Sequence, residues 1–315
     1  MDKSRKSKEF KTSVGGQALI EGILMRGPRK QAIVIRTKEG FVTKTEDVKF
    51  LKDKYPFVGW VFVRGVVNFI SSMAVGIRAL MLSAEYLPEE EQGEPSKFDQ
   101  WIEKKLGSDK AEKVIITIAL VLGVALSVGL FILLPTFLAG FVSKFVDNNI
   151  LRNLIEGALR IIIFLGYMWI STRLNDIKRM WAYHGAEHKS IFCYEKGLPL
   201  TVENVRIQPR QHPRCGTSFL FIVMIVSILV FSLTSWNNIW VRIGLRLLLL
   251  PVVVGISYEI IKIAGRYDNI LTRIISAPGK ALQRLTTKEP DDDMIETAIE
   301  ALTQVIPEDV TEAEW

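Results

Sequence analysis

Every histidine and every cysteine of this chain falls within one short stretch, between residues 184 and 215. Two of the three histidines, His184 and His188, belong to the string His-Gly-Ala-Glu-His. Imidazole and thiolate are the side chains that bind zinc-like metals best. The pattern His-x-x-Glu-His is that of the inverted zincins, in which two ligands accompany a general base. The stretch therefore predicts a metal site with a catalytic carboxylate at Glu187.

A helix over 175–195 is expected to present these side chains, because a glycine and a proline follow it closely. At about 100° per residue, His184 and His188 project within about 40° of each other, one turn apart. Both can therefore reach one ion. Glu187 lies about 60° to the other side of His184, close enough to act as a base on a water that a metal acidifies.

The third ligand has to come from outside this turn. Cys193 is half a turn away from the histidines, so packing is its expected role. His212 and Cys215 lie together where an apolar segment begins, and they complete the predicted set for zinc or another divalent metal. Carboxylates are further candidates, in the order Glu259, Glu195 and Glu203. Alternatively, the histidines are ordinary interfacial side chains that hydrogen bond to carbonyls or lipid phosphates.

The composition indicates a membrane protein of mainly α class. Hydrophobic residues make up 49% of the 315 positions, more than a core of this size needs. Uncharged runs cover Val114–Ser143 and Gly216–Val241, each longer than the ~20 residues that cross a bilayer. Two further spans, Leu151–Thr172 and Ile239–Ile263, contain charges. The sequence therefore predicts a polytopic protein with about four transmembrane helices.

The charges within those two spans are spaced for pairing. Glu156 and Arg160 are four residues apart, as are Arg242 and Arg246. Pairing between the two spans would reduce the cost of burying them. A substrate or ion pathway is the alternative interpretation.

Lysine and arginine predict the orientation. Met1–Lys11 is lysine-rich and no apolar segment of a signal peptide follows it, so the N-terminus is expected in the cytoplasm. Positive residues also flank the first span and fill 173–215, whereas 144–150 and 234–238 carry few. Both termini and the His/Cys stretch are then cytoplasmic. In that reducing compartment a Cys193–Cys215 disulfide is not expected.

The remaining segments complete five predicted regions. Residues 1–55 form a basic leader followed by a small cytoplasmic β element, in which glycines at 14–28 disfavour helix and 31–36 and 41–49 pair as a hairpin. Residues 56–87 form an interfacial or re-entrant amphipathic helix, and 88–112 a cytoplasmic linker. The transmembrane domain covers 113–263, with its insert at 173–215. A cytoplasmic region over 264–315 follows.

Two shorter elements are also predicted. A strand is expected at 202–210, and a short amphipathic helix at 291–306 precedes a mobile acidic tail. Glu21 and Arg26 in the glycine-rich segment either form an ion pair or contribute charge to the metal site.

The net charge of +6 indicates the expected partners. A basic surface beside a membrane favours contact with lipids that have anionic headgroups. A membrane-protein partner is compatible with it, and no nucleic acid is expected.

Three strings resemble one known family. They are Gly-Gly-Gln-Ala-Leu-Ile-Glu-Gly-Ile-Leu-Met-Arg-Gly-Pro at 15–28, Tyr-His-Gly-Ala-Glu-His-Lys at 183–189 and His-Pro-Arg-Cys-Gly-Thr-Ser-Phe at 212–219. Together they are similar to the YqhQ family of bacterial membrane proteins, whose function is unknown and whose members are often described as metal-dependent enzymes. The resemblance implies a bacterial plasma membrane. The chain lacks the large α/β framework of the soluble inverted zincins.

Three functions are compatible with these patterns. The first is a metal-dependent hydrolase that acts at the cytoplasmic face on a lipid-linked or membrane-associated substrate. The second is a non-enzymatic accessory or scaffold factor, for example in membrane-protein insertion. The third is a transporter.

Overall fold

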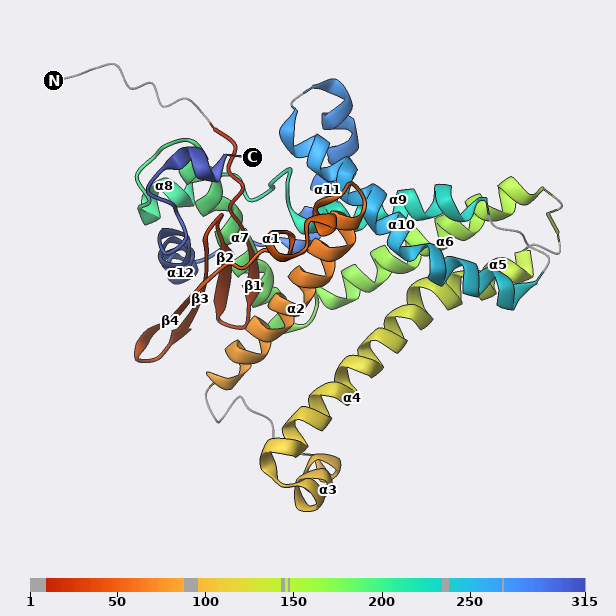
Figure 1. Ribbon diagram of the computed structural model, residues 1–315, viewed down its shortest axis with the longest axis horizontal. Coiled ribbons are helices and arrows are strands. Elements are labelled where there is room, and N and C mark those ends of the chain that lie inside the picture. The colour runs from red at the N-terminus through yellow and green to blue at the C-terminus, as the bar shows by residue number, and fades with distance from the viewer. Residues whose placement is uncertain are drawn as a thin grey trace. The chain divides into compact units, whose positions relative to one another are not determined.

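The computed structural model describes residues 10–87, 96–142, 145–146, 148–233, 238–267 and 269–314. Within them the chain is mainly helical with one small antiparallel sheet near the N-terminus, which confirms the predicted fold class (Figure 1). The chain forms two compact units. Unit 1 comprises Met1–Leu87, Met168–Ser227 and Leu249–Trp315, and unit 2 comprises Pro88–Tyr167 and Ile228–Leu248.

The sheet belongs to unit 1 and has the strand order β1-β2-β3-β4. The strands are β1 (Gly15–Leu19), β2 (Gly22–Arg26), β3 (Lys30–Thr37) and β4 (Gly40–Asp47). The predicted hairpin is the pair β3 and β4. The glycine-rich segment forms the other two strands, which the sequence did not predict. They are joined by a tight turn in which Glu21 adopts a φ of 48°.

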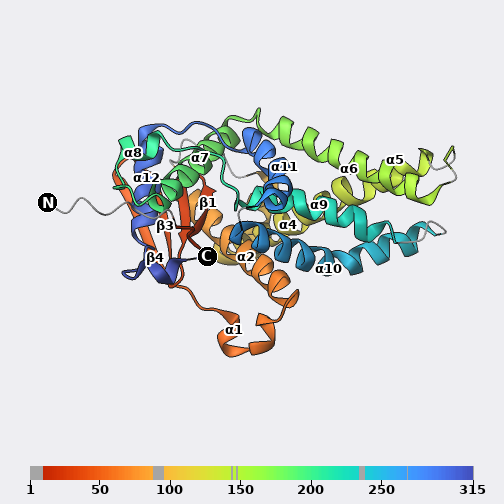
Figure 2. The ribbon, with the colours of Figure 1, turned by 90° about the horizontal axis from the view of Figure 1, so that it is seen from above.

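The consecutive apolar residues of β2 point alternately to the two faces of the sheet, and both faces are buried there. Ile23 and Met25 pack with residues of α7 (Asn175–Glu195) and α12 (Asp292–Thr303) in one core. Leu24 points the other way and packs with Ala79 of α2 (Val63–Glu85) in a second core. Successive side chains of a strand point to opposite faces, so a five-residue strand serves both cores. Figure 2 shows α7 and α12 beside the strands.

The C-terminal region completes unit 1. The predicted helix over 291–306 is confirmed as α12. The prediction of a mobile tail after it is wrong for the described residues, because Ser13 donates from its backbone to the Ala313 carbonyl at 2.6 Å. A short 3₁₀ helix, η3 (Val310–Ala313), precedes a β-bridge between Thr12 and Glu314.

The predicted strand at 202–210 is also wrong. This segment forms the short helix α8 (Val202–Arg206), followed by an irregular loop. The Thr201 side chain accepts a hydrogen bond from the backbone of Asn204 at 3.4 Å, and this cap favours a helical start.

Four helices are long and apolar enough to cross a membrane, namely Val63–Glu85, Val114–Val142, Ile150–Ser171 and Trp240–Arg266. The number agrees with the prediction, but the set differs. Of the expected span Gly216–Val241, residues Gly216–Phe231 form the apolar helix α9, which at 16 residues is shorter than the ~20 of a typical crossing, and 234–237 lie outside the described residues. The helix predicted to be interfacial, α2, has the required length instead.

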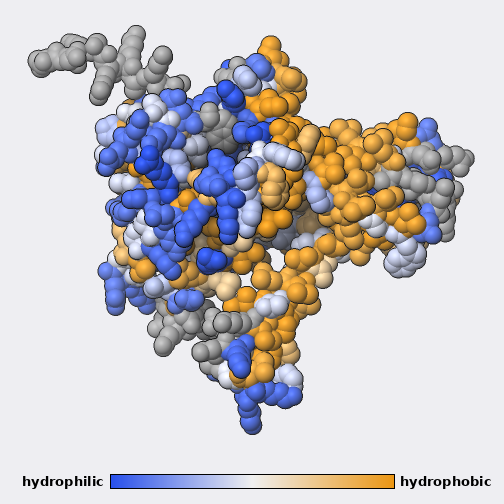
Figure 3. All heavy atoms as spheres, viewed as in Figure 1, coloured by the Kyte–Doolittle hydropathy of each residue, from blue (hydrophilic) through white to orange (hydrophobic). Residues whose placement is uncertain are grey.

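The remaining helices are α1 (Leu51–Lys54), η1 (Pro56–Gly59), α3 (Lys97–Leu106), α4 (Ser108–Val128), η2 (Gly129–Leu133), α5 (Leu134–Val142), α6 (Asn149–Ser171), α10 (Ile239–Arg266) and α11 (Ile270–Thr286). Of the predicted linker over 88–112, residues 88–95 lie outside the described residues and the rest is largely helical. The same limit applies to residues 1–9 of the leader and to 234–237. Figure 3 shows apolar residues over most of the visible surface of α4, as a lipid-facing helix requires.

Unit 2 contains the predicted pairing of buried charges. Arg246 of α10 forms an ion pair with Glu156 of α6, and both side chains are almost fully buried. Arg160 donates to the same carboxylate at 3.3 Å. The Thr136 hydroxyl donates to it at 2.8 Å. Pairing between helices thus reduces the cost of these charges.

Candidate metal centre

Three of the four predicted ligands converge in unit 1. The donor atoms of His184, His188 and Cys215 all lie within 4.8 Å of one another, and all three residues are buried. Helix α7 supplies both imidazoles from adjacent turns, while the thiol comes from the loop just before α9. His184 Nε2 lies 3.1 Å from the Sγ atom of Cys215.

Hydrogen bonds to backbone carbonyls fix the orientation of both imidazoles. His184 Nδ1 lies 2.8 Å from the carbonyl oxygen of Thr286, and His188 Nδ1 lies 2.6 Å from that of Arg210. A carbonyl only accepts, so each Nδ1 carries the proton and donates. Each Nε2 atom is thereby turned toward the cluster, where it can bind a metal once it carries no proton of its own. Metal-binding histidines are commonly held in this way by the other ring nitrogen.

Glu187 lies beside the same two nitrogens. Its Oε2 atom is 3.7 Å from His184 Nε2 and 3.9 Å from His188 Nε2. Its other oxygen accepts a hydrogen bond from the backbone of Gly16 at 2.9 Å. One oxygen is therefore fixed by strand β1, while the other faces the imidazoles.

Gly16 is required for this close approach of strand and helix. A Cβ atom at this position would lie 2.6 Å from the carbonyl oxygen of Leu24 and 3.0 Å from Cγ of Glu187. The predicted hairpin alone would not bring the glycine-rich segment to α7. The two extra strands β1 and β2 do so.

Burial and mutual charge set the protonation of the cluster. Burial opposes a charge on His184, but the Cys215 thiolate and the Glu187 carboxylate outweigh it and raise the pKa of His184 to about 9. Burial also opposes the thiolate, yet His184 and His188 lower the pKa of Cys215 well below its usual value. Burial raises the pKa of Glu187. The cluster thus favours a thiolate, the form in which cysteine binds metals.

His212, the fourth predicted ligand, lies outside this group of three. It is buried, its ring packs against Phe192, and its Nε2 atom lies 3.5 Å from Glu195 and 3.3 Å from Arg214. Burial is the main reason why its pKa is lowered to about 4. The ring is therefore neutral near pH 7.

The backbone of His212 fixes the loop that carries Cys215. Gln283 of α11 accepts from the His212 backbone at 2.7 Å and donates to the His212 carbonyl at 2.8 Å. Its amide also donates to the Ser218 hydroxyl at 3.1 Å. The fully buried Gln283 thus ties the loop to α11. Nothing in the sequence marked this glutamine.

The other candidate ligands have different partners. Glu195 forms an ion pair with Arg214 and accepts from the Thr12 backbone at 2.7 Å. Glu259 accepts from Arg64 at 2.7 Å. The exposed Glu203 lies in the first turn of α8. Cys193 is buried with Val205 and Ile295, which confirms its predicted packing role.

A cavity of about 720 Å³ opens beside the cluster. His184, Glu187, His188, His212 and Cys215 line one part of it. Apolar side chains of α2, α9 and α10 line much of the rest, including Phe69, Met73, Ile77, Phe219, Leu220 and Ile261. The cluster is therefore accessible to a small molecule that has an apolar part.

The fold and the cluster together define a helical membrane protein with a buried group of two histidines and one cysteine. A family model described as "Protein of unknown function (DUF1385)" matches residues 60–308, and the chain belongs to this family. The chain is 34% identical over 296 residues to "Uncharacterized protein YqhQ" of Bacillus subtilis (strain 168). The match covers 93% of this chain and 92% of that protein, and it confirms the resemblance seen in the three strings. No solved structure matches.

Proposed function

We propose that the protein is a membrane-bound, metal-dependent hydrolase whose ligands are His184, His188 and Cys215. The observation that carries this proposal is the hydrogen bonding of both imidazoles. Each ring donates from Nδ1 to a carbonyl, so both Nε2 atoms are turned toward one thiol. Three protein ligands leave a fourth position for water or substrate in a tetrahedral zinc site, as in catalytic rather than structural zinc sites.

Glu187 is the proposed general base. When bound, a divalent ion such as zinc would lower the pKa of a water and polarise a substrate carbonyl or phosphoryl oxygen. Glu187 would accept the proton of that water and pass it to the leaving group. The hydrogen bond from Gly16 holds one carboxylate oxygen, so the other is left for proton transfer.

The proposed substrate is membrane-associated. The cavity beside Glu187 is lined largely by apolar side chains of helices α2, α9 and α10. α2 and α10 are long and apolar enough to cross a bilayer, so the cavity would be reached from the lipid phase. The proposal also places the protein in a bacterial plasma membrane with the cluster and both chain ends on the cytoplasmic side, an orientation in which α9 crosses the bilayer and α2 enters it without crossing.

Two measurements on the full-length protein test the roles separately. Glu187→Gln should retain the metal content of the wild type but lose the phenotype that the wild-type gene restores in a deletion strain. His184→Ala should lose both. Retained phenotype in Glu187→Gln with bound metal would favour a structural ion and the accessory-factor alternative, in which anionic lipids and a membrane protein remain the expected partners.

A further inference from the structure

Arg26 occupies an unusual position at the end of strand β2. The sequence suggested an ion pair between Glu21 and Arg26, but Glu21 instead pairs with Arg179 at 2.5 Å and accepts from the Tyr183 hydroxyl at 3.2 Å. Among the described residues, no carboxylate pairs with Arg26. Its guanidinium lies 5.8 Å from the ring centre of Phe50.

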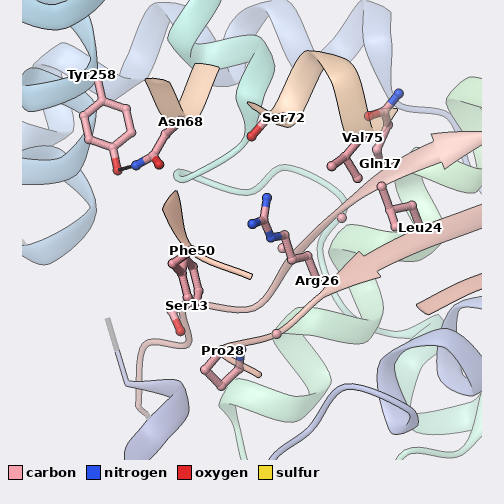
Figure 4. Close-up of a pocket in the computed structure, with 13 residues that line it drawn as sticks. Ser13, Gln17, Leu24, Arg26, Pro28, Phe50, Asn68, Ser72, Val75 and Tyr258 are labelled. Carbon is pink, nitrogen blue, oxygen red and sulfur yellow. Dashed lines mark hydrogen bonds between the residues drawn. The ribbon is translucent and has the colours of Figure 1, made fainter. Parts of the chain in front are cut away.

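The Arg26 side chain points into a second cavity of about 430 Å³ (Figure 4). It is half-buried, and this burial lowers its pKa. An arginine that is partly removed from water and lacks a carboxylate is costly unless an anion meets it. The position therefore fits a binding site for a negatively charged group.

Hydrogen-bonding groups border this cavity on several sides. Figure 4 shows Ser72 and Asn68 on one side of the guanidinium and Ser13 on another. The Asn68 amide donates to the Tyr258 hydroxyl at 2.8 Å and retains one further N–H. A phosphate offers oxygens in three directions to such donors, and arginine binds it with two parallel hydrogen bonds.

The Arg26 cavity adjoins the cavity at the candidate metal centre. Both are lined by Ser13, Gly15, Gly16, Gln17, Asn68, Ser72 and Tyr258. Gly15 lies on the edge strand β1, and the position where its side chain would stand is open, with nothing within 4 Å. A single ligand can therefore extend from Arg26 past Gly15 to Glu187.

We infer that the Arg26 cavity binds the phosphate group of a membrane amphiphile whose apolar part lies in the larger cavity. This inference names the substrate class of the proposed hydrolase and to that extent rests on the proposed function. Met73 and Leu220 line the larger cavity and are 50% and 40% exposed on apolar helices. An acyl or prenyl chain enters between them from the bilayer.

Calorimetric titration of the full-length protein in a neutral maltoside detergent tests the inference, with monododecyl phosphate as the probe. Arg26→Gln should weaken binding about tenfold or more, because a charged hydrogen-bond partner is lost. Arg26→Lys keeps the charge and should bind with intermediate affinity. The matched control is Arg29→Gln, which removes a charge that pairs with Glu312 at the surface and should leave binding unchanged.

Two other probes distinguish the sources of the anion. Inorganic phosphate and dodecanoate should each bind at least about tenfold more weakly than dodecyl phosphate. If inorganic phosphate bound as tightly as dodecyl phosphate, the inference that the ligand is an amphiphile would be wrong. If dodecanoate bound as tightly, the inference that the site selects a phosphate group would be wrong. Wild-type affinity in Arg26→Gln, or no binding of dodecyl phosphate by the wild type, would overturn the site itself.

The His184→Ala variant separates this inference from the proposed function. It should lose metal yet keep binding of dodecyl phosphate that depends on Arg26. Binding lost in His184→Ala but unchanged in Arg26→Gln would mean that the anion sits at the metal, which contradicts the inference. A wild type without metal would contradict the hydrolase and leave the Arg26 measurement valid.

Discussion

His184 Nε2 lies 3.1 Å from Cys215 Sγ, although the two residues are 31 positions apart in the chain. Helix α11 holds helix α7 and the loop before α9 here, since its Gln283 binds the N–H and the carbonyl of His212 and its Thr286 carbonyl accepts from His184 of α7. The pair and the nearby His188 form the centre of the proposed site.

Zinc should protect Cys215 from alkylation. A thiolate bound to a metal is a poor nucleophile, so iodoacetamide should modify Cys215 about tenfold or more slowly in zinc-loaded protein than in chelator-treated protein. Peptide mass spectrometry of timed samples measures the rate of alkylation at both thiols of the chain. Cys193 packs elsewhere and is the internal control. Equal rates at Cys215 with and without zinc would count against its role as a ligand.

Gly16→Ala should destabilise unit 1 by about 1–3 kcal/mol, since the added methyl group meets backbone in a tightly packed region. Its Cβ would lie 2.6 Å from the Leu24 carbonyl oxygen. Gly15→Ala is the matched control, because a Cβ there has nothing within 4 Å. The unfolding midpoint in detergent measures both variants. Equal midpoints would refute the close approach at Gly16.

The stability of metal-free protein should fall as the pH drops from 6.5 toward 4. Burial lowers the pKa of His212 to about 4, so the folded state resists a proton that the unfolded chain accepts near 6.5. The neutral His212 ring therefore contributes its full stability above pH 6.5, and this contribution is lost as the pH falls from 6.5 to about 4. Unfolding midpoints across this range should fall less in His212→Gln. An identical fall in both proteins would show that other groups cause it.

Glu156→Gln should destabilise unit 2 strongly, by about 3–5 kcal/mol, because it leaves a buried arginine without its counter-charge. Arg246 is 1% exposed and pairs with this carboxylate. Glu103→Gln, on the exposed face of α3, should change stability by less than about 0.5 kcal/mol. Unfolding in detergent compares the two variants, and a mild effect of Glu156→Gln would show that the pair is not needed.

The sequence predicted the local parts of the site well. The period of an α-helix places His184, His188 and Glu187 on neighbouring turns, and the same period separates Cys193 from them. Cys215 was one of five candidates for the third position, with His212, Glu259, Glu195 and Glu203. Its choice over His212 depends on tertiary contacts of Gln283 and Glu195, which have no local pattern in the sequence.

The strands at the N-terminus were predicted only in part. Glycines made 14–28 look irregular, because glycine weakens strands and favours turns. In the fold they permit close packing instead, as Gly16 does against Leu24 and Glu187. The isolation of Arg26 was equally hidden, since it depends on Glu21 pairing with Arg179 from another element.

Metal analysis of purified full-length protein tests the central claim most directly. After expression in zinc-replete medium, elemental analysis should find about one metal ion per chain in the wild type and in His212→Gln, and almost none in His188→Ala. Wild-type protein without stoichiometric metal, or His188→Ala that retains it, would contradict a metal centre formed by His184, His188 and Cys215.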